Sequence, residues 1–114
     1  MTQFLFIYRR PHDQRPLSPA QIQEVIPRWQ AWFKDLAEQG HLKDGGSPLE
    51  YSGRVVRESR KGVTDGPYAE KDLVMGYSLV EARDIDEACK LATGCPQLAT
   101  QMAVEVRPIM QFNP

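Results

Sequence analysis

The sequence predicts an α+β domain in which two helices cover one face of an antiparallel β-sheet. Three observations lead to this prediction. β-prone runs occur near both ends and in the middle of the chain, two segments space their apolar residues as helices do, and each of these two begins with a capping motif. The 114 residues suffice for one domain with a single core, spanning residues 1–114.

The first expected strand is Phe4–Tyr8, an aromatic and aliphatic run that ends before Pro11. Alternate residues of a strand point to opposite faces, so Leu5 and Ile7 face away from the three aromatic residues. Both faces of this strand are therefore apolar, and such strands are usually covered on both sides. Two helices cover only one face of the sheet, and a symmetric homodimer is the simplest source of a second cover.

A long helix is expected next, beginning at Ser18-Pro19-Ala20-Gln21. This motif combines a serine N-cap, a proline at the first helical position and the glutamine of a capping box. Pro27 lies inside the helical pattern, where we expect a kink rather than a break. Gly40 is placed to end the helix in the left-handed conformation. The apolar stripe of this helix consists of Ile22, Val25, Ile26, Trp29, Phe33 and Leu36.

The middle of the chain is expected to hold a loop, a strand and a turn. Leu42–Pro48 is rich in glycine and is predicted to be the loop, and Glu50–Glu58 is predicted to be the second strand. Ser59–Gly62 is expected to turn the chain back into an added β-hairpin. The strongest strand pattern follows at Leu73–Ala82.

The last third of the chain is expected to hold one short helix and one strand. Asp84-Ile85-Asp86-Glu87 is a second capping box, and Gly94 with Pro96 ends the helix that it begins. Met102–Met110 is the final predicted strand. The order strand, helix, strand, hairpin, strand, helix, strand is typical of the split βαβ, ferredoxin-like arrangement.

Composition excludes several function classes. Hydrophobic residues make up 41% of the chain and charged residues 25%, with a formal net charge of -1. The balanced charge argues against a nucleic-acid or anionic-membrane partner, and the apolar runs are too short to span a bilayer. Cys89 and Cys95 do not form a disulfide-dense pattern, so we expect reduced thiols in a cytoplasmic protein. His12 lacks the spacing of a metal ligand, and nucleotide-binding motifs are missing, so no metal or cofactor is expected.

Several motifs resemble those of a known family. They are Val63-Thr64-Asp65-Gly66-Pro67-Tyr68-Ala69-Glu70, Gly76-Tyr77, Asp86-Glu87-Ala88, Gly94-Cys95-Pro96 and Val104-Glu105-Val106-Arg107-Pro108. Together they resemble the YCII-related domain family, specifically its DGPF-type branch. The resemblance implies a ferredoxin-like fold that dimerises as an α/β barrel. It implies little about a reaction, although distant relatives of this architecture include lactone isomerases and a dehydrochlorinase for aromatic compounds.

The sequence departs from this family pattern at two positions that bear on chemistry. Some YCII relatives carry a histidine on the first helix, proposed to pair with an acid, and the matching position here is Trp29. The aspartate that those relatives often have before the proline ending the second helix is Cys95 here. A His–Asp mechanism is therefore unsupported. The loop also differs, because Glu70 runs directly into Lys71 where most DGPF-type members have one more residue.

The Asp65-Gly66-Pro67 stretch has two interpretations. In the structural one, Asp65 accepts a backbone hydrogen bond and Gly66 adopts a conformation that a side chain would resist. In the functional one, the turn presents Asp65, Tyr68 and Glu70 at the rim of a cleft. The two carboxylates would then be candidate catalytic bases and Tyr68 a ligand-binding residue.

Glu105 and Arg107 are two residues apart on the last strand, so they share a face. Val104 and Val106 need the helical layer, which turns the charged pair toward the helix-free face and the expected dimer interior. There Arg107 is either a catalytic anchor for an anionic ligand, with Glu105 holding it, or half of an ion pair that fixes the strand. An empty pocket would pair Arg107 with Asp65 or Glu70. Trp29 and Tyr77 complete the ligand-binding candidates, although Trp29 is most simply explained as a core or groove residue.

Three functions are open on this basis. One is a small enzyme doing general acid–base chemistry on a carbonyl or lactone-like metabolite, which rests on analogy of fold. Another is a non-catalytic or regulatory accessory module that binds a small anionic metabolite. The third is a structural protein with no ligand. The missing histidine shifts weight from the enzyme to the binding module.

Overall fold

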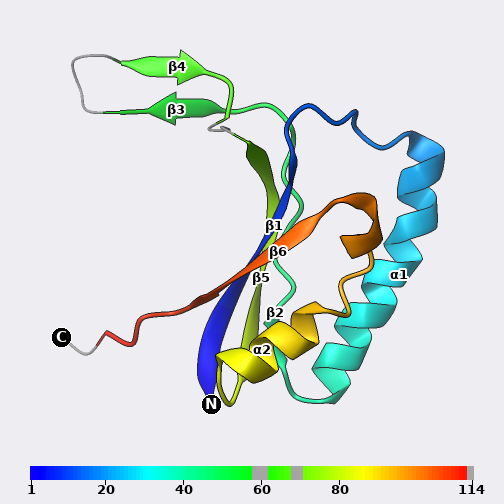
Figure 1. The fold of residues 1–114 in the computed structure, drawn as a ribbon, viewed down its shortest axis with the longest axis vertical. Coiled ribbons are helices and arrows are strands. Elements are labelled where there is room, and N and C mark those ends of the chain that lie inside the picture. Colours follow the sequence, from blue (N-terminus) through cyan, green and yellow to red (C-terminus); the bar gives the residue numbers. More distant parts are fainter. Residues whose placement is uncertain (58–61, 68–70, 113–114) are drawn as a thin grey trace.

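The computed structural model describes residues 1–57, 62–67 and 71–112 of the chain. Within these ranges, four of the six strands lie between the two α-helices in the sequence, and Figure 1 shows how these elements are arranged. The elements are β1 (Thr2–Pro11), α1 (Pro19–Glu38), β2 (Leu42–Asp44), β3 (Arg54–Val56), β4 (Val63–Asp65), β5 (Asp72–Ala82), α2 (Ile85–Ala92), a short 3-10 helix (Leu98–Thr100) and β6 (Ala103–Pro108).

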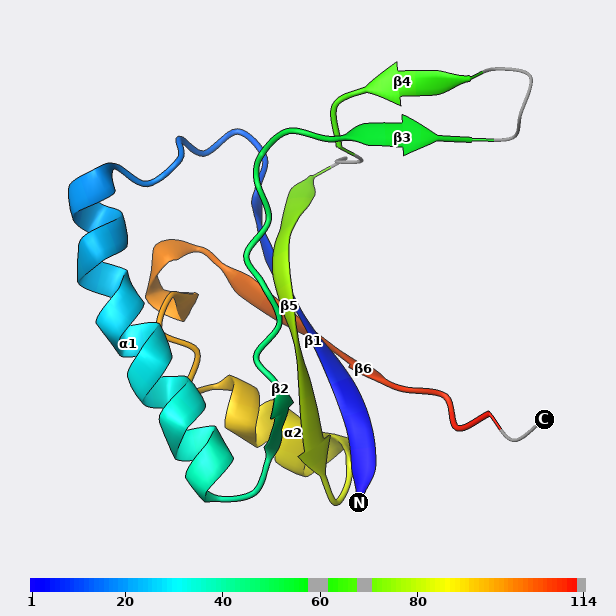
Figure 2. The same ribbon diagram turned by 180° about the vertical axis from the view of Figure 1, so that it is seen from behind.

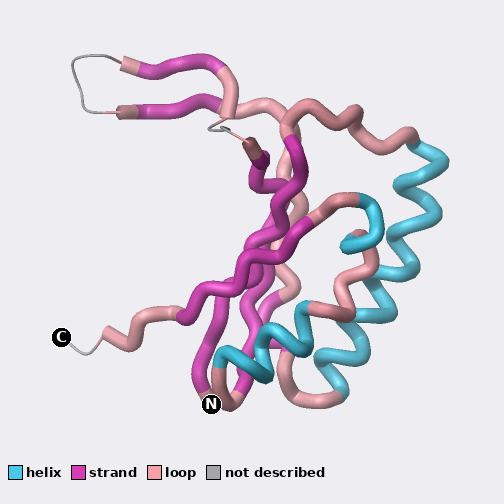
Figure 3. Tube along the Cα trace, in the orientation of Figure 1, coloured by secondary structure: helices cyan, strands magenta, loops and turns pink. Residues whose placement is uncertain are grey.

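The main sheet has four strands in the order β2-β5-β1-β6, and every neighbouring pair is antiparallel. With β3 and β4 set aside as a hairpin, this is the strand order of the ferredoxin-like fold. Both helices lie on one face of the sheet (Figures 1 and 3). The predicted α+β class and the split βαβ topology are therefore confirmed. Within the part of the chain that the structure describes, the sheet does not close into a barrel.

The helix boundaries follow the capping residues. Ser18 Oγ accepts a hydrogen bond from the Gln21 amide, and the Gln21 side chain accepts one from the Ser18 amide, so the predicted capping box of α1 is present. The helix continues through Pro27 without a break. Gly40 follows it with φ +79°, the left-handed conformation expected at this end. At α2, Asp84 Oδ1 accepts from the Glu87 amide.

The segment between α1 and β5 differs from the prediction. The expected loop Leu42–Pro48 contains β2, which pairs with β5, because Leu42 packs against the core. Gly46, at φ +69°, lies so close to the Tyr77 carbonyl that no side chain would fit there. The expected strand Glu50–Glu58 is shorter than predicted, and residue 58 lies outside the described residues. Its strand part, β3, pairs only with β4 and stands away from the sheet in Figure 2.

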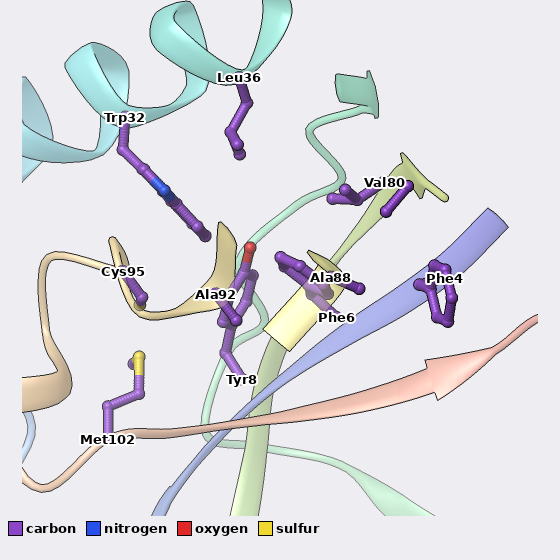
Figure 4. Packing of buried hydrophobic residues seen from close by; sticks show 11 residues of the cluster. Phe4, Phe6, Tyr8, Trp32, Leu36, Val80, Ala88, Ala92, Cys95 and Met102 are labelled. Carbon is purple, nitrogen blue, oxygen red and sulfur yellow. The ribbon is translucent and has the colours of Figure 1, made fainter. Parts of the chain in front are cut away.

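The core fills the space between the sheet and the two helices (Figure 4). Phe4, Phe6 and Tyr8 of β1 are buried there, as the alternation in this strand predicts. They pack with residues of β5, α1, α2 and the segment that leads to β6, namely Val80, Ala82, Trp32, Leu36, Ala88, Ala92, Cys95 and Met102. Leu5 and Ile7 point to the helix-free face and are only half-buried.

Candidate functional site

A cleft with a volume of about 500 Å³ opens between α1 and the sheet edge next to β2. One wall is the apolar stripe of α1 from Ile22 to Phe33, and the other is the chain from Gly45 to Leu49 with the middle of β5. Tyr8, Gln97 and Met102 also line it. This volume is within the usual range of small-molecule sites. Ile22 and Ile26 of the helical wall are 43% and 46% exposed, so the predicted stripe is only partly covered by protein.

Aromatic rings form the inner end of the cleft. The ring of Tyr8 meets that of Trp29 edge to face, with centroids 4.9 Å apart, and Phe33 lies 5.7 Å from Trp29. The indole N–H of Trp29 donates to Gln97 Oε1 at 2.7 Å, which fixes the orientation of the indole. Gln97 is itself buried. The cleft therefore has a pre-positioned aromatic surface.

Tyr8 brings a hydroxyl group to this site. Its O–H donates to Ser78 Oγ at 2.8 Å, and the Ser78 hydroxyl donates onward to the Gly45 carbonyl at 2.7 Å. Burial raises the pKa of Tyr8 well above that of a free phenol. Tyr8 is thus protonated at neutral pH and acts as a donor rather than as a base.

Of the predicted catalytic residues, Asp65 and Arg107 do not line this cleft. Asp65 ends β4 with a side chain 96% exposed, 3.5 Å from Arg54 Nε. Gly66 has φ +85°, which supports the interpretation of Asp65-Gly66-Pro67 as a structural turn. Tyr68 and Glu70 lie outside the described residues, so their predicted roles are untested.

Glu105 and Arg107 lie on the helix-free face, as the alternation along β6 predicts, while Val104 and Val106 pack toward the core. Arg9 Nε lies 2.6 Å from Glu105 Oε1, and Arg107 Nη1 lies 3.4 Å from Glu105 Oε2. The hydrogen bond from Arg9, with the charges of both arginines, lowers the pKa of Glu105. The prediction for an empty pocket pairs Arg107 with Asp65 or Glu70. The first alternative is wrong, because Asp65 pairs with Arg54 and Arg107 with Glu105. Glu70 lies outside the described residues.

Two of the predicted ligand-binding residues, Trp29 and Tyr77, do line the cleft. Sequence reasoning missed Tyr8 and Gln97. Tyr8 had a usable signal, since alternation places it on the helical side of β1, but its placement beside Trp29 depends on how α1 packs across the sheet. Gln97 follows the end of α2 in a segment without a periodic pattern, so no signal could have found it.

The sequence model of the YCII-related domain matches residues 1–113, almost the whole chain. The chain belongs to the YCII-related domain family. No curated protein matches it. Among solved structures it is similar in fold to a YCII-family protein, the 5-chloro-2-hydroxyhydroquinone dehydrochlorinase TftG from Burkholderia phenoliruptrix AC1100, in complex with 2,5-dihydroxybenzoquinone. The identity is 19%, the TM-score is 0.54, and the match covers 96% of this chain and 95% of that chain.

The cleft contains one of the two positions at which this YCII-family chain departs from relatives with a His–Asp pair. Trp29, at the histidine position, lines the cleft, and Cys95, at the aspartate position, is buried in the adjoining core. Burial raises the pKa of the Cys95 thiol to about 11, so it is not a thiolate at neutral pH. Neither residue supplies a base. Cys89, on α2, is exposed.

Residues 1–57, 62–67 and 71–112 contain no cluster of three or more histidine, cysteine, aspartate or glutamate residues that could hold a metal ion. Over the same ranges, no helix has the length and apolar character needed to cross a membrane.

Proposed function

We propose that this YCII-family protein binds a small, flat, largely apolar ring compound in the cleft between α1 and the sheet. The observation that carries the proposal is the lining of the cleft, where the rings of Tyr8, Trp29 and Phe33 meet the aliphatic side chains of α1. An apolar surface with a few fixed polar groups favours a ring with one or two polar substituents. TftG is described in complex with a flat ring compound, 2,5-dihydroxybenzoquinone.

Binding is favoured over carboxylate- or histidine-based catalysis. No acidic residue, basic residue or histidine is among the described residues that line the cleft. General acid–base catalysis needs a group within hydrogen-bonding reach of the transferred proton, with a pKa suited to the operating pH. The protonated Tyr8 hydroxyl meets the first condition for an acid, but no residue of the lining meets both for a base.

Acid–base chemistry on a carbonyl or lactone-like compound is the second candidate, and one observation favours it. The Tyr8 hydroxyl carries a proton at the inner end of the cleft and would donate it to a carbonyl oxygen once it turned from Ser78. Incubation with a neutral lactone such as coumarin tests this candidate. Product formed by the wild type and lost in Tyr8→Phe supports an enzyme, and unchanged coumarin limits the role to binding.

Calorimetric titration with 2-naphthamide, a flat and neutral probe, tests the main proposal. We expect saturable binding by the wild type. Ile26→Trp should abolish it by filling the cleft, and Trp29→Ala should weaken it roughly ten-fold through the loss of ring contact. The matched control is Arg28→Gln, on the exposed side of the same helix, where the arginine pairs with Glu24. A wild type that binds no probe, or an Ile26→Trp variant that binds as well as the wild type, would contradict the proposal.

A further inference from the structure

Arg10 stands at one end of the cleft. It follows Tyr8 by two residues on β1, so the two side chains share the helical face of the strand. Its Nη1 donates to the hydroxyl of Tyr51, which lines the cleft, at 3.3 Å. Its Nη2 donates to the Arg15 carbonyl at 3.0 Å, directly before Pro16, another residue of the lining. The guanidinium group therefore lies behind the rim formed by Pro16 and Tyr51.

Among the residues that the structure describes, no carboxylate pairs with Arg10. The acceptors that the described part of the chain offers it, the Gln14 side chain, the Tyr51 hydroxyl and the Arg15 carbonyl, are all neutral. None of the ion pairs formed within the described ranges involves it. In contrast, an acidic partner is present for Arg9, Arg28, Arg54, Arg83 and Arg107. A half-buried guanidinium group without a counter-ion favours an anion nearby.

The guanidinium group is held in place and still has donors to offer. Its Nε donates to Gln14 Oε1 at 2.7 Å, and the Gln14 side chain in turn donates to the side chain of Gln101, next to Met102 of the cleft. A guanidinium group has five N–H donors, and three are used here, so one remains on each terminal nitrogen. The Tyr51 hydroxyl accepts from Arg10, which leaves its own proton for a ligand.

We propose that the ring compound bound in the cleft carries a carboxylate or a comparable anionic group, which Arg10 and Tyr51 bind at the cleft end. This inference rests on the proposed function and names the ligand class, an aromatic acid. The ring lies against Trp29 and the aliphatic wall of α1. The anionic oxygens accept hydrogen bonds from the two remaining N–H groups of Arg10 and from the Tyr51 hydroxyl. These hydrogen bonds are charge-assisted, and a neutral ring compound lacks them.

The test compares two probes of the same shape, 2-naphthoate and 2-naphthamide, by calorimetric titration. The wild type should bind the naphthoate about ten-fold more tightly, as expected for hydrogen bonds to a charged group. Arg10→Gln should remove this preference and leave the affinity for the amide unchanged. Arg10→Lys keeps the positive charge but loses the paired N–H donors of the planar guanidinium group, so it should retain part of the preference for the naphthoate. Arg28→Gln, which removes an arginine of the exposed face of α1, should retain all of it.

The outcomes separate this inference from the proposed function. If neither probe binds the wild type, both fail. If the wild type binds the two probes equally, or Arg10→Gln keeps the preference, only the anionic ligand class fails. Melting temperatures show whether Arg10→Gln is folded. If it is not, the salt dependence of the unchanged protein decides, because added salt should weaken binding of the naphthoate and not of the amide. Equal salt dependence of the two probes would overturn the inference.

Discussion

The Tyr8 hydroxyl donates to Ser78 Oγ at 2.8 Å, which joins the central strand β1 to β5 through side chains as well as through backbone hydrogen bonds. Ser78 is completely buried, and its hydroxyl donates a hydrogen bond to the Gly45 carbonyl. One hydroxyl therefore connects the core, the sheet and the loop wall of the cleft. The stability of the fold and the shape of the site depend on the same two residues.

Ser78→Ala should lower the free energy of unfolding by about 1–3 kcal/mol, because it leaves the buried Tyr8 hydroxyl and the Gly45 carbonyl without their partner. Denaturant unfolding measures the change. Ser47→Ala is the matched control, since Ser47 lines the same cleft but is exposed, and it should unfold like the wild type. A Ser78→Ala variant as stable as the wild type would show that water or another group replaces the serine.

The fold could be predicted from the sequence because its signals are local. The Ser18 and Asp84 caps, the alternation in β1 and the glycine at position 40 each act within a few residues of themselves. The edge strand β2 could not be predicted in this way. Leu42–Asp44 is too short to show alternation, and it is a strand only because β5 offers a free edge beside it.

The site was harder to predict, because its residues meet only after folding. Tyr8 and Trp29 come from β1 and α1, and Gln97 comes from the segment after α2. The composition of the loop around Asp65 indicated a candidate catalytic residue. In the structure, Asp65 lies on an exposed hairpin and pairs with Arg54. Arg10 had no sequence signal, since its placement at the cleft end, with only neutral acceptors among the described residues, becomes visible in three dimensions.

Gly94→Ala should destabilise the fold by about 1–3 kcal/mol through overpacking. A Cβ atom at this position would lie 2.7 Å from Trp32 Nε1, inside the buried cluster shown in part in Figure 4, so the indole or the chain would have to shift. Gly45→Ala is the control, because its added Cβ atom would meet only Phe33 at 3.7 Å, an ordinary contact. Thermal unfolding of both variants gives the comparison. Equal melting temperatures would show that Trp32 relaxes freely.

We propose that the helix-free face forms a homodimer. Leu5 and Ile7 lie half-buried at its centre, and the β3–β4 hairpin and the C-terminal segment both extend away from the helical layer on this side (Figures 1 and 2). Met110 and Phe112 of that segment are 83% and 78% exposed. A second copy of the chain would cover these apolar surfaces, as expected for a strand that is apolar on both faces.

Sedimentation velocity at micromolar concentration should therefore give twice the mass of the chain. Ile7→Glu should shift the protein to the monomer, since it places a charge at the centre of the interface. The control is Ile85→Glu, which adds the same charge at an exposed position at the start of α2, in the helical layer, and should remain dimeric. A monomeric wild type would refute the dimer, and a dimeric Ile7→Glu variant would place the interface elsewhere.

The Arg9–Glu105–Arg107 cluster should make stability depend on acid pH. The hydrogen bond and charge of Arg9, with a smaller contribution from Arg107, hold the pKa of Glu105 below its usual value of about 4.3. The unfolded chain therefore binds the proton more readily, so the contribution of Glu105 is complete above that value and is lost as the pH falls through the lower folded-state pKa. The Glu105 side chain is 32% exposed, so solvent weakens the effect.

Glu105→Gln should flatten the decline of stability in this acid range, measured by denaturant unfolding at a series of pH values. Glu50→Gln, at an exposed position, should follow the wild-type curve. If Glu105→Gln declines as steeply as the wild type, the cluster does not couple the protonation of Glu105 to folding.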